Sequence, residues 1–95
     1  MREIAKDEFW GKLPKRINEK SINNVSMTFY KNINNEYFMI YRTYNMRHNY
    51  MISLEYFEIS YYEYLEENDG YDYSSNKYDS SNSDYKKRFN YGYDD

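Results

Sequence analysis

Apolar residues recur at two different spacings along this chain, and the change from one to the other predicts its elements. Near the N-terminus, Phe9, Leu13 and Ile17 lie four residues apart, which is the spacing of one helical face. Trp10 adds to the same side. This pattern predicts a helical segment over residues 3–19.

Two residues interrupt the predicted helical segment. Gly11 weakens a helix because it has no side chain to restrict its backbone, and Pro14 removes a backbone donor and clashes with the preceding turn. We therefore expect either a kink or two short helices, with Pro14 in the first turn of the second.

The middle of the chain alternates between apolar and polar residues and predicts three β-strands. These segments are residues 25–32, 36–44 and 50–59. Asn34 and Asn35 supply a turn between the first two, because asparagine tolerates a positive φ. A second turn falls within residues 45–49. Three consecutive strands with short turns predict an antiparallel meander.

The central predicted strand is apolar on both faces. Phe38 and Ile40 lie on one face, and Tyr37, Met39 and Tyr41 lie on the other. Because successive side chains of a strand point to opposite sides, this pattern leaves open which face meets the core.

A second helix follows the strands. Ser60 and Glu63 have the spacing of a capping box, in which each side chain bonds the backbone N–H of the other residue. The predicted helix covers residues 61–67 and ends at 68–70, where Gly70 can adopt the left-handed conformation.

The predicted order is therefore α-β-β-β-α, which corresponds to an α+β fold with a three-stranded antiparallel meander packed against helices. Residues 1–70 would form one small domain. Residues 71–95 form a tail that contains six tyrosines, five serines, five aspartates and three asparagines. Such low-complexity composition is typical of disordered or turn-rich segments, and it could also support self-association.

Tyrosine accounts for 15 of the 95 residues. Its side chain offers a large, rigid and amphipathic contact surface at low entropic cost, so this composition favours a protein that binds a partner. The abundance of asparagine, lysine, tyrosine and isoleucine is also typical of AT-rich coding sequences. It indicates a low-GC bacterium or its phage, and this bias alone could account for much of the tyrosine content.

The net charge of −3 hides an uneven distribution. Residues 1–50 carry nine basic and five acidic side chains, whereas residues 51–70 carry six acidic and no basic ones. Carboxylates along a helix can imitate a row of phosphates, and interleaved tyrosines can act as anchors. The candidate partner-binding residues are Glu63, Glu66, Glu67, Asp69, Tyr61, Tyr62, Tyr64, Tyr71 and Tyr73.

The sequence disfavours catalysis and predicts no catalytic residue, metal site or cofactor. It has no cysteine, three dispersed glycines and one histidine, His48, in a predicted turn. A phosphate-binding loop needs clustered glycines, and a thiolate zinc site needs cysteines. We expect His48 to be exposed to solvent.

A second hypothesis is direct binding of single-stranded nucleic acid. Such proteins combine aromatic stacking platforms with a basic groove. Near the predicted first helix, Lys12, Lys15, Arg16 and Lys20 would share roughly one helical face, and Arg42 in the second predicted strand and Arg47 in the following turn would add charge. Double-stranded-RNA-binding domains share the αβββα order, but their second helix is basic whereas this one is acidic.

Neither end of the chain predicts membrane insertion or export. Residues 1–8 contain no apolar core typical of a signal peptide, and no apolar run reaches the ~20 residues that span a bilayer. We expect a soluble protein of the cytoplasm with no membrane partner.

Three features give the chain a resemblance to known proteins: the element order over residues 3–67, the hairpin Asn34-Asn35-Glu36-Tyr37, and the acidic run Glu63, Glu66, Glu67 and Asp69. The chain resembles small acidic anti-CRISPR and anti-defence proteins encoded by phages. The tyrosine-rich tail lies outside this pattern. The resemblance implies a non-enzymatic inhibitor that occupies the nucleic-acid-binding surface of a host defence nuclease, with a CRISPR effector as the first candidate partner.

Overall fold

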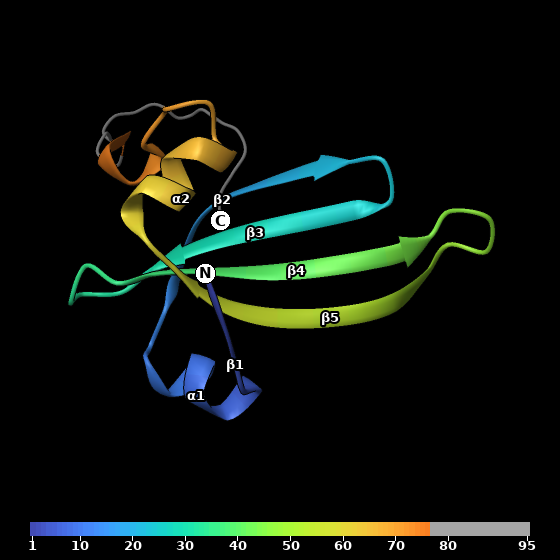
Figure 1. Ribbon diagram of the computed structural model, residues 1–95, viewed down its shortest axis with the longest axis horizontal. Coiled ribbons are helices and arrows are strands. Elements are labelled where there is room, and N and C mark those ends of the chain that lie inside the picture. The colour runs from blue at the N-terminus through green and yellow to red at the C-terminus, as the bar shows by residue number, and fades with distance from the viewer. Residues whose placement is uncertain (77–95) are drawn as a thin grey trace.

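The computed structural model describes residues 1–76, which form an α+β fold around one open antiparallel sheet (Figure 1). The elements are β1 (Arg2–Ile4), α1 (Lys6–Gly11), β2 (Lys15–Ile22), β3 (Val25–Lys31), β4 (Tyr37–Asn45), β5 (Tyr50–Ile59), α2 (Tyr61–Glu67) and a 3-10 helix, η1 (Tyr73–Asn76). The sheet has five strands in the order β1-β5-β4-β3-β2. The α+β class is confirmed, whereas the three-stranded meander is only the centre of a larger sheet.

The predicted helix over residues 3–19 is wrong. Only Lys6–Gly11 is helical, and strands lie on both sides of it. The chain turns at Leu13, which has a φ of 55° and is 76% exposed, and Pro14 prevents the helix from resuming. The flanking segments instead pair with β5 and β3 through backbone hydrogen bonds, which side-chain periodicity does not reveal.

The three central strands are confirmed to within one residue at each end. Their turns use asparagine at positive φ, with Asn35 at 61° and Asn49 at 57°. In the β3–β4 turn, Asn32 Oδ1 accepts hydrogen bonds from the backbone N–H groups of Asn34 and Glu36, at 3.1 and 3.0 Å. Side-chain capping of the turn therefore fixes the register of this hairpin.

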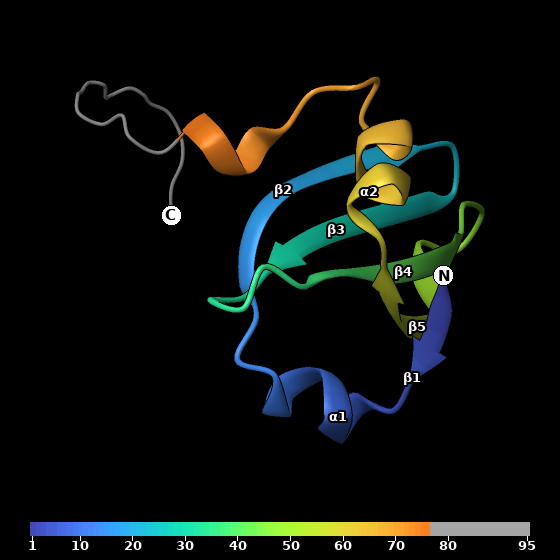
Figure 2. The ribbon, with the colours of Figure 1, turned by 60° about the vertical axis from the view of Figure 1, so that its left-hand side comes forward.

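Both faces of the central strand β4 are apolar because both are covered. On one face, Met39 packs in a cluster with Tyr64 of α2. On the other face, Phe38 and Ile40 pack with Phe9 of α1. Figure 2 shows α2 overlapping β2 and β3 in the view, and α1 below the strands.

The second helix has the predicted limits. Ser60 Oγ accepts from the backbone N–H of Glu63 at 3.0 Å, and Glu63 Oε1 accepts from the backbone N–H of Ser60 at 2.7 Å. This reciprocal pair is the predicted capping box. After the helix, Gly70 has a φ of 81°, and its N–H donates to the carbonyl of Leu65.

The first residues of the predicted tail pack against the domain. Ser74 is buried, and η1 lies beside β2. Residues 77–95, which make up the rest of the predicted low-complexity tail, lie outside the described residues.

Candidate partner-binding surface around α2

The exposed tyrosine and acidic side chains after the sheet gather around one helix. We call this region the α2 surface, and it comprises Tyr61, Tyr62, Glu66, Glu67, Asp69, Tyr71 and Tyr73. Tyr62 is the most exposed of its tyrosines at 79%, and the others lie between 39% and 47%. Large aromatic rings that remain this accessible are the kind of side chain that anchors protein–protein contacts.

Tyr64 does not belong to the α2 surface, although the sequence places it among the candidate anchors. Its side chain is fully buried, with its ring stacked on Tyr37 at 5.1 Å and edge-on to Phe29 at 5.6 Å. Burial raises the pKa of the Tyr64 phenol to about 12. Tyr64 is therefore the core residue that fastens α2 to the sheet.

Glu63 is also engaged within the fold. Besides capping the helix, its Oε2 lies 2.7 Å from the amino nitrogen of Met1. That ammonium group, followed by the backbone N–H of Ser60, lowers the pKa of the Glu63 carboxyl. A partner that used Glu63 would have to compete with these bonds, so its role is primarily structural.

The chain beyond α2 folds back onto the start of the helix. The hydroxyl of Tyr61 donates to Asp72 Oδ2 at 3.0 Å, and the hydroxyl and backbone N–H of Ser74 donate to Asp72 Oδ1 at 2.5 and 2.9 Å. Burial pushes the pKa of Asp72 upward, but these hydrogen bonds outweigh it and the pKa is lowered. The bond to Asp72 raises the pKa of Tyr61.

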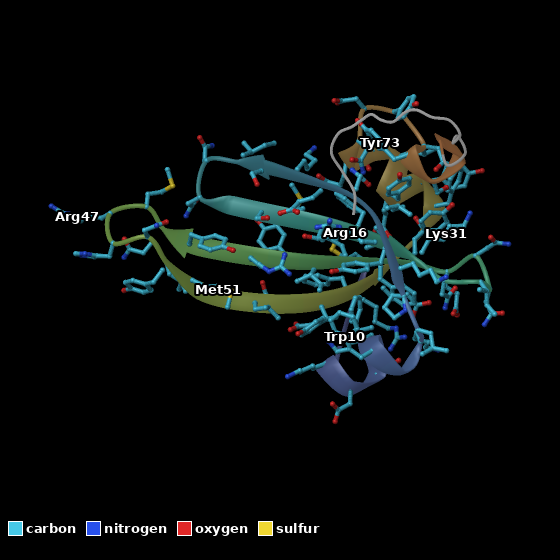
Figure 3. The ribbon with its side chains drawn as sticks, turned by 180° about the vertical axis from the view of Figure 1, so that it is seen from behind. Trp10, Arg16, Lys31, Arg47, Met51 and Tyr73 are labelled. Carbon is cyan, nitrogen blue, oxygen red and sulfur yellow. The ribbon has the colours of Figure 1, made fainter. Side chains whose placement is uncertain are left out.

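The same segment places two further tyrosines together. The rings of Tyr71 and Tyr73 meet edge to face at 4.5 Å. The backbone N–H of Tyr73 donates to the hydroxyl of Tyr64 at 2.8 Å. The orientation of the outer tyrosines is therefore tied to the core. Figure 3 shows Tyr73 at the helical end of the molecule and Arg47 at the far tip of the β4–β5 hairpin.

Three carboxylates of the α2 surface are not used by the ion pairs found within residues 1–76. Those pairs involve Glu63, Glu8, Glu58 and Glu19. Glu66 and Asp69 are exposed and Glu67 is partly exposed. One cation does approach the helix, because Lys20 Nζ of β2 donates to the backbone carbonyl of Glu67.

Sequence reasoning missed the two asparagines that attach the C-terminal end of α2 to the sheet. Asn68 is buried, its Nδ2 donates to the carbonyl of Tyr64, and its Oδ1 accepts from Asn18 Nδ2 of β2, both at 2.8 Å. No local signal marks this pair, since the two asparagines are 50 residues apart. The role of Asp72 had a local signal, because an aspartate two residues before a serine is typical of an Asx-turn.

The basic residues proposed for nucleic-acid binding do not form one face. Lys15, Arg16 and Lys20 lie on strand β2 and not on a helix. In a strand, successive side chains point to opposite faces. Lys12 follows α1, and Arg47 lies in the β4–β5 turn. Two of these residues bond other side chains of the chain: Arg16 pairs with Glu19 at 3.4 Å on the surface, and Arg42 donates to Thr28 Oγ1 at 2.8 Å.

His48 is exposed in the β4–β5 turn, as predicted, and its ring lies parallel to that of Tyr50 at 6.2 Å. In the part of the chain that the structure describes, no three His, Asp or Glu side chains are grouped to hold a metal ion. Over residues 1–76, no helix is long and apolar enough to cross a membrane.

The chain was compared with protein-family models, with curated proteins and with solved structures, and none of the three comparisons gave a match.

Proposed function

We propose that this chain is a non-enzymatic binding protein whose α2 surface occupies the basic, nucleic-acid-binding surface of a partner protein and thereby inhibits it. One observation supports this proposal above the others. Exposed tyrosines lie together with carboxylates that form no ion pair within residues 1–76, whereas the basic residues considered for nucleic-acid binding are divided among β2, β4 and two turns.

The anchoring of the α2 surface favours binding. Tyr64 and Asn68 hold the helix against the sheet, and Asp72 holds the following segment against Tyr61. Side chains that are already ordered lose little entropy when a partner binds, so more of the contact energy appears as affinity. The exposed tyrosines would supply desolvated anchors, and the carboxylates would provide attraction to a basic groove.

The class of partner follows from this chemistry. A row of carboxylates beside planar rings imitates the phosphates and bases of a nucleic acid, so the complementary surface is one that normally binds nucleic acid. The resemblance to phage-encoded anti-defence proteins makes guide-loaded CRISPR nucleases the first partners to test, and it is consistent with a chain encoded by a phage or mobile element.

The experiment measures how strongly guide-loaded CRISPR nucleases from low-GC bacteria bind labelled target DNA in the presence of this chain. We expect the wild type to reduce DNA binding by at least one nuclease. The variant Glu66→Lys with Asp69→Asn should weaken that inhibition by at least ~10-fold, because it removes attraction to basic residues. Asparagine is chosen at 69 because Asp69 has a φ of 57°, which asparagine tolerates.

The matched control changes charge by the same amount on the other side of the sheet. Asp7→Lys with Glu8→Gln alters two exposed residues of α1 and should leave inhibition unchanged. Equal weakening by both variants would show a general charge effect and would contradict a specific α2 contact. Binding of labelled oligonucleotides by the chain alone, without inhibition of any nuclease, would instead support the nucleic-acid-binding alternative.

An aromatic anchor provides a second test. Tyr62 is 79% exposed, so removing its ring has little effect on the core. If Tyr62 is a binding anchor, Tyr62→Ala should weaken inhibition roughly 30-fold, which corresponds to the ~2 kcal/mol that defines a hot spot. An unchanged inhibition constant would exclude Tyr62 from the contact.

A further inference from the structure

The connection between α1 and β2 holds a leucine in a conformation that leucine rarely adopts. Leu13 has a φ of 55° and is 76% exposed. A positive φ is strained for a bulky side chain, and a side chain in solvent gains almost nothing from the core in return. Residues kept in strained backbone conformations cluster at functional sites, so Leu13 marks this connection as a candidate contact.

Two further apolar side chains are exposed near Leu13 in the fold. Ile33, in the β3–β4 turn, is 89% exposed, and Trp10, near the end of α1, is 46% exposed. The side-chain amide of Asn32 donates to the backbone carbonyl of Lys12 at 3.2 Å, which joins the β3–β4 turn to the α1–β2 connection. Figures 1 and 2 both show these two segments close together. We call Trp10, Leu13 and Ile33 the apolar tip.

The fold already holds the apolar tip in place. The backbone N–H of Leu13 donates to the carbonyl of Trp10 at 3.2 Å. The ring of Trp10 packs edge-on to those of Phe9 and Tyr30, at 4.7 and 6.2 Å. One part of the indole is therefore packed while the rest remains accessible, so little ordering entropy would be lost on binding.

Basic side chains accompany the apolar tip. Residues 10–16 and 31–36 together contain four basic residues, Lys12, Lys15, Arg16 and Lys31, and one carboxylate, Glu36. The acidic residues of α1 lie in its first turn, before the tip. Within residues 1–76, none of the three lysines forms an ion pair. Lys15 lies opposite Lys31 in the β2–β3 register, and like charges in opposite positions destabilise a sheet, so an anion bound here would relieve repulsion.

We propose that the apolar tip inserts into the surface of a membrane that contains anionic lipids, while the lysines pair with lipid phosphates. Tryptophan and aliphatic side chains flanked by lysine and arginine are typical of contacts at the boundary between headgroups and acyl chains. Nucleic acid fits less well, because Leu13 and Ile33 cannot stack on bases as aromatic rings do. A contact at the membrane surface needs no apolar run of spanning length, which is the feature from which the sequence predicted no membrane partner.

The proposed contact does not depend on the function proposed for the α2 surface. α1 packs on one face of the sheet, against Phe38 and Ile40, and α2 packs on the other, against Met39. Contact through the tip would therefore leave the α2 surface accessible, and vesicle binding and nuclease inhibition are separate measurements.

The fluorescence of Trp10 reports on the tip alone, because it is the only tryptophan of the chain. Vesicles of phosphatidylglycerol and phosphatidylcholine should shift its emission to shorter wavelength and carry the full chain into the vesicle pellet. Vesicles of phosphatidylcholine alone should bind at least ~10-fold more weakly, because the lysines lose their anionic partners. An unshifted spectrum with both vesicles, or equal binding to both, would overturn the proposal. A shift with single-stranded oligonucleotides but not with vesicles would overturn it in favour of nucleic acid.

Leu13→Asn separates binding from folding, because asparagine tolerates the positive φ. The variant should melt at least ~2 °C above the wild type. It should bind the anionic vesicles at least ~10-fold more weakly, which is the factor expected for one leucine side chain left in water. Unchanged vesicle binding would contradict insertion of the tip, and a lowered melting temperature would overturn the inference from backbone strain.

The matched control is Ile22→Asn, which replaces an aliphatic residue that is 53% exposed at the opposite end of the sheet (Figure 1). This variant should bind the anionic vesicles like the wild type. Equal weakening by Ile22→Asn and Leu13→Asn would show a general effect of exposed apolar side chains and would contradict a specific contact through the tip.

Discussion

The hydroxyl of Tyr64 accepts a hydrogen bond of 2.8 Å from the backbone N–H of Tyr73. Tyr64 is fully buried, whereas the side chain of Tyr73 is 40% exposed. A core residue thus determines where an exposed tyrosine of the α2 surface lies. The same bond satisfies part of the hydrogen-bonding capacity of a buried hydroxyl, which would otherwise destabilise the fold.

Tyr64→Phe tests this link. The variant keeps the aromatic packing but leaves the N–H of Tyr73 without its acceptor, so we expect a loss of ~1 kcal/mol in the free energy of unfolding. Urea denaturation measures the change. Tyr62→Phe is the control, because Tyr62 is largely exposed, and it should have no measurable effect. Equal stability of the Tyr64 variant and the wild type would show that the bond contributes nothing.

The raised pKa of Tyr64 predicts a loss of stability at alkaline pH. Its pKa is about 12 in the folded chain, compared with ~10 for a free phenol. The folded state retains the phenol proton more strongly than the unfolded state. The protonated Tyr64 therefore contributes fully to the free energy of unfolding below pH ~10, and this contribution is lost as the pH rises towards ~12. Ultraviolet titration should show a phenol that ionises near pH ~12 in the wild type. Its persistence in Tyr64→Phe would contradict the assignment.

The lowered pKa of Glu63 predicts the opposite dependence in acid. Its folded carboxyl is more acidic than usual because of the Met1 ammonium group and the Ser60 N–H. The ionised Glu63 therefore contributes to stability above pH ~4.3, the ordinary pKa of glutamate. This contribution is lost as the pH falls through the pKa of Glu63 in the folded chain. Asp72, whose pKa is also lowered, acts in the same direction.

Glu63→Gln separates the contribution of Glu63 to the acid dependence of stability from that of Asp72. Glutamine can still cap Ser60, but it loses the ion pair with Met1, so we expect a loss below ~1 kcal/mol at pH 7. The difference from wild type should vanish in strong acid, where Glu63 is protonated. Urea midpoints at neutral and acidic pH measure this convergence. A constant difference across pH would exclude the ion pair as the cause.

Two glycines provide a matched test of backbone conformation. A Cβ would meet no atom within 4 Å at either Gly11 or Gly70, but only Gly70 has a positive φ, at 81°. Gly70→Ala should therefore destabilise the fold by ~1 kcal/mol, whereas Gly11→Ala should stabilise it by roughly 0.4–1 kcal/mol. Thermal unfolding of both variants measures the difference. Effects of the same sign would contradict this explanation.

The partly buried hydrogen bond between Asn18 and Asn68 joins β2 to the end of α2 at 2.8 Å. A double-mutant cycle with Asn18→Ala and Asn68→Ala should give a coupling of ~0.5–1.5 kcal/mol. The single change at Asn68 should cost more than that at Asn18, because Asn68 also bonds the carbonyl of Tyr64. If the free-energy changes of the two single substitutions simply add in the double variant, the two asparagines are not energetically coupled.

Local signals predicted the elements that depend on neighbours in the sequence. The alternation over residues 25–59 identified β3, β4 and β5, and the Ser60–Glu63 spacing identified the start of α2. The prediction of a helix over residues 3–19 failed because β1 and β2 are edge strands. They are held by backbone hydrogen bonds to β5 and β3. An edge strand does not require a regularly alternating apolar face, so the sequence pattern did not reveal it.

The candidate surface divides in the same way. The sequence alone determined that tyrosine and carboxylate side chains are concentrated around residues 61–73, because composition and charge are local properties. Only the tertiary structure decided that Tyr64 is buried and Tyr62 is exposed, because burial depends on which face of α2 meets the sheet. The structure likewise decided that Glu63 is bound to Met1, 62 residues away, and that β1 pairs with residues 56–58 of β5, since both follow from how distant segments pack.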